Sequence, residues 1–305
     1  MVRLQRCLTS ITRNQYPRDL IEIVVVDNES TDGSAAGARE SGAIVIKSPG
    51  DSVAAHRNRG ARAALGSIIA FVDSDHEIDR HWIVAAVDVL TDPNVAATGS
   101  AYLTQPYPNW VQQQYDGMRS RPVRREDVSW LGSGNFAVKR AAFERVGGFN
   151  ATLTACEDVD LCNRLRLAGH RIVADPDLRS VHFGDPKTLK ALFFGELWRG
   201  RDNLRVTLSG PRTFRHLRSA LVPIADLACI AAGVVALLTG HPVMALALWA
   251  LALVPAGIKA ALIVRRQLRR GLVSAAQAFA VVLVFDLARA FALLAKGSHR
   301  ARRTA

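Results

Sequence analysis

Two long apolar segments near the C-terminal end constrain the fold of this 305-residue chain more than any other feature. Residues 219–240 and 242–264 are each long enough to cross a hydrocarbon core of about 30 Å, which takes roughly 20 helical residues. Because lipid offers no partners to backbone N–H and C=O groups, such segments fold as helices. The turn residues Gly240, His241 and Pro242 separate them, which predicts a helical hairpin in a membrane.

Most of the positive charge of the chain surrounds these segments. The formal net charge is +12, and the sequence from residue 258 onward holds ten Lys and Arg residues but a single acid, Asp286. Basic residues beside apolar segments favour membrane lipids with anionic headgroups as partners, and not nucleic acid. By the positive-inside rule, the basic flanks of the hairpin lie in the cytoplasm. We therefore expect a multi-pass protein of the inner cell membrane whose N-terminal domain is cytoplasmic.

Two further segments are related to the membrane. A third apolar segment, residues 272–295, is interrupted by Asp286 and Arg289, which are three residues apart and can neutralise each other. The sequence favours a third span here over a helix in the cytoplasmic interface. Residues 186–204 have an amphipathic pattern followed by arginines, which predicts an interfacial helix. We place that helix in a first domain at 1–210 and the spans in a membrane domain at 211–305.

The N-terminal part of the chain alternates predicted strands and helices. Apolar runs predict strands at 21–27, 43–46 and 68–72, with helical segments between them. This rhythm is typical of an α/β protein with a doubly wound parallel sheet. The run from Ile68 to Val72 has the composition of a strand buried on both faces, and it ends in Asp73 and Asp75.

Acidic residues follow two of these strands. Asp27 ends the first strand, and Asp73 and Asp75 end the third, so all three are expected at the sheet edge where α/β proteins bind ligands. Adjacent carboxylates repel each other, and a divalent cation relieves that repulsion while leaving positions for phosphates. Asp27 can accept a hydrogen bond from a nucleobase, and Arg57 can contact a phosphate or hold an acid. The alternatives are turn or helix-capping acids and an arginine on a solvated helix face.

Several ordered motifs resemble the signature of family 2 glycosyltransferases. They are V-V-V-D-N-E-S-T-D-G-S at 24–34, H-R-N-R-G at 56–60, F-V-D-S-D at 71–75, G-S-G-N-F at 132–136, V-G-G-F at 146–149 and E-D-V-D-L at 157–161. The resemblance implies a GT-A fold with a mostly parallel central sheet. It also implies that Asp27 contacts the nucleobase and that the acids at 73 and 75 bind the diphosphate of a nucleotide sugar through Mn²⁺ or Mg²⁺.

The resemblance assigns roles to residues in the second half of this domain. It places the general base of an inverting transfer at Asp158, with Glu157 beside it at the start of a predicted helix. First-turn acids are also favoured by the helix dipole alone. The glycine-rich segment at Gly134 and Asn135 is expected to line the donor and acceptor pocket, with Asn135 contacting a sugar hydroxyl. His182 is either a structural residue or a further metal ligand.

The expected function is the transfer of a single sugar from a nucleotide-diphosphate sugar to a lipid or lipid-linked glycan acceptor at the cytoplasmic membrane face. The Q-x-x-R-W motif of processive polysaccharide synthases is absent, which disfavours that alternative. The family normally begins with a strand that ends in a Pro-x-x-Asn-type loop, and this sequence starts at the following helix. We expect that strand to be encoded upstream. If it is missing, the alternative is a catalytically weak, membrane-tethered binder of nucleotide sugars.

Overall fold

The computed structural model describes residues 1–119, 124–210, 214–266 and 271–294, and these form two compact units. The first is built from Met1–Gln105 and Arg121–Gly184, and the second from Pro106–Ser120 and Asp185–Gly297. The helical segments between residues 185 and 210 therefore group with the apolar helices and not with the sheets. The functional division at residue 210 stays a prediction.

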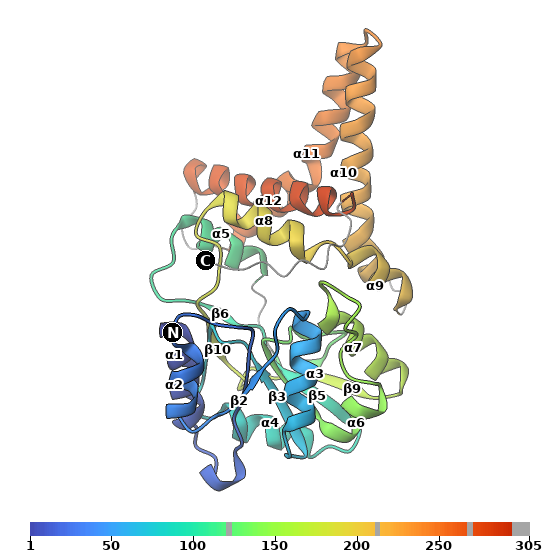
Figure 1. Ribbon diagram of the computed structural model, residues 1–305. Coiled ribbons are helices and arrows are strands. Elements are labelled where there is room, and N and C mark those ends of the chain that lie inside the picture. The colour runs from blue at the N-terminus through green and yellow to red at the C-terminus, as the bar shows by residue number, and fades with distance from the viewer. Residues whose placement is uncertain (120–123, 211–213, 267–270, 295–305) are drawn as a thin grey trace. The chain divides into compact units, whose positions relative to one another are not determined.

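The described strands of the first unit form three sheets (Figure 1). In the two-stranded sheet, β1 (Val24–Asp27) runs parallel to β2 (Ile44–Lys47). The five-stranded sheet has the order β3-β8-β5-β9-β7, with bounds Ile68–Val72, Asn135–Lys139, Val95–Gly99, Arg171–Ala174 and Glu126–Asp127. The three-stranded sheet has the order β4-β10-β6, with bounds His76–Ile78, Ser180–His182 and Leu103–Thr104.

The helices of the first unit alternate with the early strands as predicted. They are α1 (Val2–Thr12), the 3₁₀ helix η1 (Arg18–Leu20), α2 (Ser34–Glu40), α3 (Val53–Ala63), α4 (Trp82–Leu90), α6 (Arg140–Arg145) and α7 (Glu157–Leu167). The α/β class is confirmed, but the parallel arrangement is wrong for the five-stranded sheet, because three of its four neighbouring strand pairs are antiparallel. β8 runs antiparallel to both β3 and β5, so the five-stranded sheet is mixed, with β3, β5 and β9 in one direction. An antiparallel neighbour needs no crossover helix, so the strand–helix rhythm of the first three strands did not reveal it.

β3 packs on both faces, as its composition predicts. Ile69 and Phe71 belong to one buried cluster, while Ile68 and Val72 pack against a second, and only Ala70 between them is exposed in this strand. The ring of Phe71 contacts aromatic rings from α6 and from the segment after it, with centroid distances of 5.0–5.6 Å. This packing fixes the carboxyl end of β3, from which Asp73 and Asp75 extend.

The second unit is helical in its described part. Its helices are α5 (Trp110–Arg119), α8 (Leu189–Arg199), α9 (Asn203–Ser209), α10 (Phe214–Leu238), α11 (Pro242–Arg266) and α12 (Leu272–Ala292). α10 and α11 form the predicted hairpin, and Gly240 in its turn has the left-handed φ of 81° that favours glycine. By length and composition, Leu221–Leu238, Pro242–Arg266 and Leu272–Ala292 are each able to cross a membrane.

The predicted interfacial helix at 186–204 is divided between α8 and α9. The apolar stripe of α8 contacts protein: Leu192 is fully buried in a cluster with Val111 and Tyr115 of α5 and Val281 of α12. Packing onto neighbouring helices therefore accounts for part of the amphipathic pattern, and the interfacial position of this segment stays a prediction.

Candidate functional site

Two of the predicted acids in the first unit, Asp27 and Asp73, lie at the ends of strands. Asp27 is the last residue of β1; its side chain is buried, and its Oδ1 accepts a hydrogen bond from the Ser30 backbone N–H at 3.3 Å. This is turn chemistry, which the sequence had left as the alternative for Asp27. Asp73 follows β3 with 45% of its side chain exposed, so it is accessible to a ligand.

Arg57 of α3 joins two of the predicted site acids. Its Nη2 donates to Asp73 Oδ1 at 2.8 Å, and its Nη1 donates to Glu157 Oε1 at 2.6 Å. The guanidinium is only 13% exposed, and although burial disfavours its charge, Asp73 and Glu157 raise the pKa of Arg57 above its ordinary value. Of the two roles that the sequence left open for Arg57, holding acids is the one that the structure shows.

Asp158 lies in the first turn of α7, immediately after Glu157. Its Oδ1 accepts a hydrogen bond from the Val159 backbone N–H at 2.8 Å. Burial, followed by the charge of Glu157, raises the pKa of Asp158 to about 7. A carboxylate with this pKa is a stronger base than an ordinary aspartate and is still substantially ionised at neutral pH.

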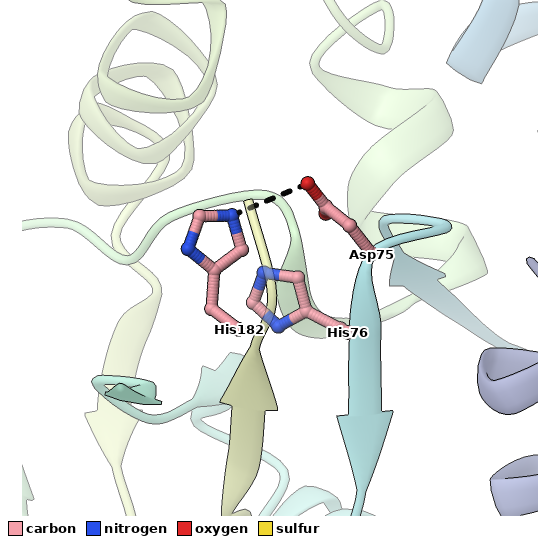
Figure 2. A group of neighbouring side chains, drawn as sticks. All are labelled: Asp75, His76 and His182. Carbon is pink, nitrogen blue, oxygen red and sulfur yellow. Dashed lines mark ion pairs between the residues drawn. The ribbon is translucent and has the colours of Figure 1, made fainter. Parts of the chain in front are cut away.

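A second cluster consists of Asp75, His76 and His182, whose possible ligand atoms all lie within 4.8 Å of one another. Figure 2 shows the three side chains converging, His76 from β4, Asp75 from the turn before it and His182 from β10, with His182 Nε2 3.4 Å from Asp75 Oδ2. His76 and His182 are partners in the antiparallel register of these two strands, which places their rings together. Burial opposes ionisation of Asp75, but the hydrogen bond and charge of His182 lower its pKa below the ordinary value.

The surroundings of this cluster fit a divalent cation. His76 Nδ1 lies 3.0 Å from Ser180 Oγ, and a hydrogen bond of this kind orients the imidazole of a metal ligand. A Cβ on Gly184 would collide with Asp75 Oδ2, and one on Gly134 would lie 2.6 Å from Asp73 Oδ2 and 3.2 Å from His76 Nε2. The two glycines let the backbone approach the acids and imidazoles closely. One carboxylate and two imidazoles form a donor set suited to a transition-metal ion.

His76 is the member of this cluster that sequence reasoning missed. It directly follows the D-S-D segment, which was the available signal, but the three-residue strand β4 is too short to give a periodic pattern. The alignment of His76 with His182 depends on the pairing of β4 with β10, more than a hundred residues later in the chain.

Asn135 is a correction to the predicted pocket. It is 1% exposed; its Oδ1 accepts from Trp82 Nε1 at 2.6 Å, and its Nδ2 donates to the Ser100 and Leu178 carbonyls at 3.0 and 2.9 Å. Its amide is therefore used within the core and does not contact a sugar. Gly134 and Glu157 do lie at the site, Gly134 against Asp73 and Glu157 on Arg57.

Comparison with known proteins agrees with this geometry. Residues 2–147 match the model of glycosyl transferase family 2. Glycosyltransferase AglE of Haloferax volcanii is 28% identical over 204 residues, which cover 64% of each chain. A pre-mycofactocin glycosyltransferase of Mycobacterium tuberculosis is 32% identical over 138 residues, 42% of this chain and 29% of the relative. The chain thus spans less than two thirds of the length of either relative.

Among solved structures, the mannosyltransferase PcManGT from Pyrobaculum calidifontis, in complex with GDP-Man and Mn²⁺, superposes with a TM-score of 0.57. The match covers 93% of this chain and 83% of that protein at 21% identity, which establishes the fold. The first unit thus has the GT-A fold. The part of this domain at residues 2–147 is similar to glycosyl transferase family 2.

Proposed function

We propose that this protein is a membrane-anchored inverting glycosyltransferase that moves one sugar from a nucleotide-diphosphate sugar to a lipid or lipid-linked glycan. The observation that carries the proposal is the arrangement of acids in the first unit. Arg57 holds Asp73 and Glu157 while Asp158, next to Glu157, has a pKa raised to about 7. The named relatives are themselves glycosyltransferases, which supports the reaction class.

Asp158 is proposed as the general base. An acceptor hydroxyl has a pKa far above 7, so a carboxylate must take its proton as the oxygen attacks. In this single displacement the bond from the acceptor oxygen to the anomeric carbon forms as the bond to the donor diphosphate breaks. The proton passes to Asp158, and the nucleoside diphosphate leaves. One displacement at the anomeric carbon inverts its configuration.

Asp75, His76 and His182 are proposed to hold a divalent cation. When bound there, the cation supplies positive charge that stabilises the diphosphate leaving group. Two imidazoles favour Mn²⁺ over Mg²⁺, because Mg²⁺ prefers oxygen ligands. The GT-A mannosyltransferase of similar fold was solved with Mn²⁺, which agrees with this preference.

The remaining residues are proposed to bind and position the donor. Asp27, at the end of β1, accepts a hydrogen bond from the nucleobase. Asp73, partly exposed beside the metal cluster, faces the sugar diphosphate. Arg57 fixes the orientation of Asp73 and Glu157 through its two ion pairs, so its role is positioning more than direct contact with a phosphate.

The membrane unit is proposed to keep the reaction at a lipid surface. The α10–α11 hairpin is long and apolar enough to cross the bilayer twice. Arginines precede α10 and end α11, so the positive-inside rule places both flanks, and the GT-A domain with them, in the cytoplasm. Lipid-linked acceptors are confined to the same surface, which raises their local concentration near the site.

The test is turnover by the full chain in lipid nanodiscs, with a panel of nucleotide sugars, a polyprenyl phosphate acceptor, and Mn²⁺ or Mg²⁺. We expect one donor to give a glycolipid carrying a single sugar of inverted anomeric configuration, with loss of activity in EDTA and better recovery by Mn²⁺. A retained configuration contradicts the role of Asp158, and a polymeric product identifies a processive synthase. Donor binding without transfer to any acceptor identifies a binder.

A further inference from the structure

α12 carries two charged side chains, and each is bonded to a different helix. Lys259 Nζ of α11 donates to Asp286 Oδ1 at 2.5 Å. Arg289 is paired with Glu196 of α8, with Nε and Nη2 at 2.9 and 2.8 Å from Oε2. The expectation that Asp286 and Arg289 neutralise each other is therefore wrong, and their separate partners restrict where α12 can lie.

Glu196 is held in place by its neighbours, and it lies on the side of the membrane from which α10 starts. It is 1% exposed, and it also accepts hydrogen bonds from Tyr115 at 2.6 Å and Arg199 at 2.9 Å. Within the described residues, no segment able to span a membrane lies between the GT-A domain and α10. α8 is therefore on the same side of the membrane as the GT-A domain.

The start of α12 is on this side as well. α11 returns across the bilayer and ends at Arg266, and α12 begins at Leu272. The six Cα-to-Cα steps from Arg266 to Leu272 reach at most about 21 Å when fully extended, less than a hydrocarbon core of about 30 Å. Both the first residue of α12 and the partner of Arg289 are thus confined to one side.

If α12 crossed the membrane, Arg289 could not reach Glu196. At 1.5 Å per residue, Arg289 lies about 25 Å along the helix from Leu272, which would bring it close to the opposite leaflet surface. The Glu196 pair instead requires Arg289 on the near side. Lys259 gives a second constraint, since it lies about 10 Å from the end of α11 whereas Asp286 lies about 21 Å from the start of α12. The difference of about 11 Å exceeds the reach of a lysine side chain.

We infer that α12 lies in the plane of the membrane surface on the side of the GT-A domain, so that the chain crosses the bilayer twice. Within the second unit, α12 runs across the base of the α10–α11 hairpin and alongside α8 (Figure 1). Apolar side chains are exposed at both of its ends, at Leu272 and Val273 and at Phe291 and Leu294. These fit the boundary between headgroups and acyl chains of the near leaflet.

The sequence beyond α12 supports this placement. Four basic residues and no acids follow residue 295, and an in-plane α12 returns them to the cytoplasmic side that the positive-inside rule favours. The partner of the α12 surface is therefore the cytoplasmic leaflet, next to the helices through which the GT-A domain joins the membrane unit. The inference rests on the proposed membrane insertion of the hairpin.

The test measures the depth of single labels on the full chain in nanodiscs, with Cys156 and Cys229 replaced by serine. Ala276→Cys, Leu283→Cys and Phe291→Cys report on the beginning, middle and end of α12, and Leu251→Cys reports on the middle of α11. Each label is quenched with lipids that carry a spin label near the headgroup or deep in the acyl chain. We expect a deep-to-shallow quenching ratio above one at Leu251 and a similar ratio below one at all three α12 positions.

Two results overturn the inference, and they are distinguishable. A ratio above one at Leu283, with Phe291 quenched only from the opposite leaflet, shows that α12 spans while the hairpin remains inserted. Absence of lipid quenching at Leu251 shows that the proposed anchoring itself is wrong. A reporter fused after Ala305 gives an independent reading: we expect it on the cytoplasmic side, and labelling from the opposite side contradicts the in-plane placement.

Discussion

Each unit of this molecule contains a cluster of charged side chains. The ratio of carboxylates to cations is opposite in the two clusters. In the GT-A domain, the one guanidinium of Arg57 pairs with both Asp73 and Glu157, and Asp158 lies beside them. Acids exceed cations there. In the helical unit the ratio is reversed, because the single carboxylate of Glu196 pairs with two guanidinium groups and accepts a hydrogen bond from a tyrosine hydroxyl.

The pKa values record this difference. Burial and the neighbouring Glu157 raise the pKa of Asp158 to about 7. Burial has the same tendency at Glu196, but Arg289, Arg199 and Tyr115 overcome it and lower its pKa below the ordinary value. Burial alone therefore does not bring the pKa of a carboxyl group close to 7. The pKa rises that far only where too few cations lie nearby to offset the burial. The first cluster is suited to take up a proton, and the second is suited to fix helices.

The largest expected effect comes from removing the carboxylate of Asp158, with which no cation is paired directly among the described residues. Asp158→Asn should lower kcat for sugar transfer by about 10²–10⁴-fold, the usual contribution of a positioned general base, while donor affinity changes little. Product formation measured by chromatography and donor binding measured by calorimetry separate these two effects.

The matched control for this change is Asp160→Asn, two residues further along α7. Asp160 is ion-paired with Arg164 at 2.6 Å, so its loss should affect the helix and leave transfer nearly unchanged. Near wild-type transfer by Asp158→Asn, or equal losses in both variants, would show that the first-turn acids serve the helix and that the base lies elsewhere.

The second prediction concerns the cluster around Glu196 in the helical unit. Glu196→Gln leaves Arg199 and Arg289 without their shared carboxylate, and breaking a buried ion pair in this way costs about 3–5 kcal/mol. We expect a lower Tm for the full chain in nanodiscs. Glu144→Gln is the control, because Glu144 is 61% exposed in its pair with Arg140 and such pairs contribute at most about 1 kcal/mol. Equal Tm values for the two variants would contradict the structural role of Glu196.

The third prediction is a dependence on pH with opposite signs for rate and stability. Transfer requires ionised Asp158, so kcat/KM should rise through an apparent pKa of about 7. The folded state holds this proton more tightly than the unfolded chain, so its stabilisation is complete below pH 4 and is lost as pH rises through 7.

The stability part is checked by comparing Tm with that of Asp158→Asn between pH 5 and 8. A shift from 3.8 to about 7 corresponds to at most about 4 kcal/mol, and partial solvent access reduces it. The asparagine variant should be the more stable protein above pH 7, with a difference that falls to less than half at pH 5 and vanishes only below pH 4. A wild-type advantage at pH 8 would show that Asp158 is stabilised by its surroundings, as Glu196 is.

The sequence predicted where the acids lie along the chain, because strand ends and helix starts can be located without any knowledge of packing, while their roles stay predictions. Asp27, Asp73 and Asp158 all lie where β1, β3 and α7 begin or end. What it could not predict depends on pairing between distant segments. Asn135 looked like a loop residue beside glycines, but Trp82 draws it into the core.

The same limit applies to the membrane unit. Spacing along α12 suggested an internal pair between Asp286 and Arg289, whereas α8 and α11 supply the actual partners. Composition identified the apolar helices correctly, since it depends only on local sequence. The orientation of α12 relative to the hairpin depends on tertiary contacts. The charged residues of α12 indicate that orientation only once their partners on other helices are known.

The smallest expected effect concerns Cys156, the residue before Glu157 and Asp158. It has a left-handed backbone with φ of 60° and ψ of 22°, which costs an L-residue roughly 1 kcal/mol and costs glycine almost nothing. This conformation starts α7 at Glu157, so the strain directs Glu157 and Asp158 into the site. Cys156→Gly should keep that geometry and raise the free energy of unfolding relative to Cys156→Ala by about 1 kcal/mol.

Alanine is the matched control because both variants lose the thiol, so only the backbone preference differs. At an ordinary helix position alanine is the more stable of the two by a similar amount, so the sign alone decides. A more stable alanine variant, by thermal unfolding of the full chain, would show that the left-handed start of α7 is not what orients the acids.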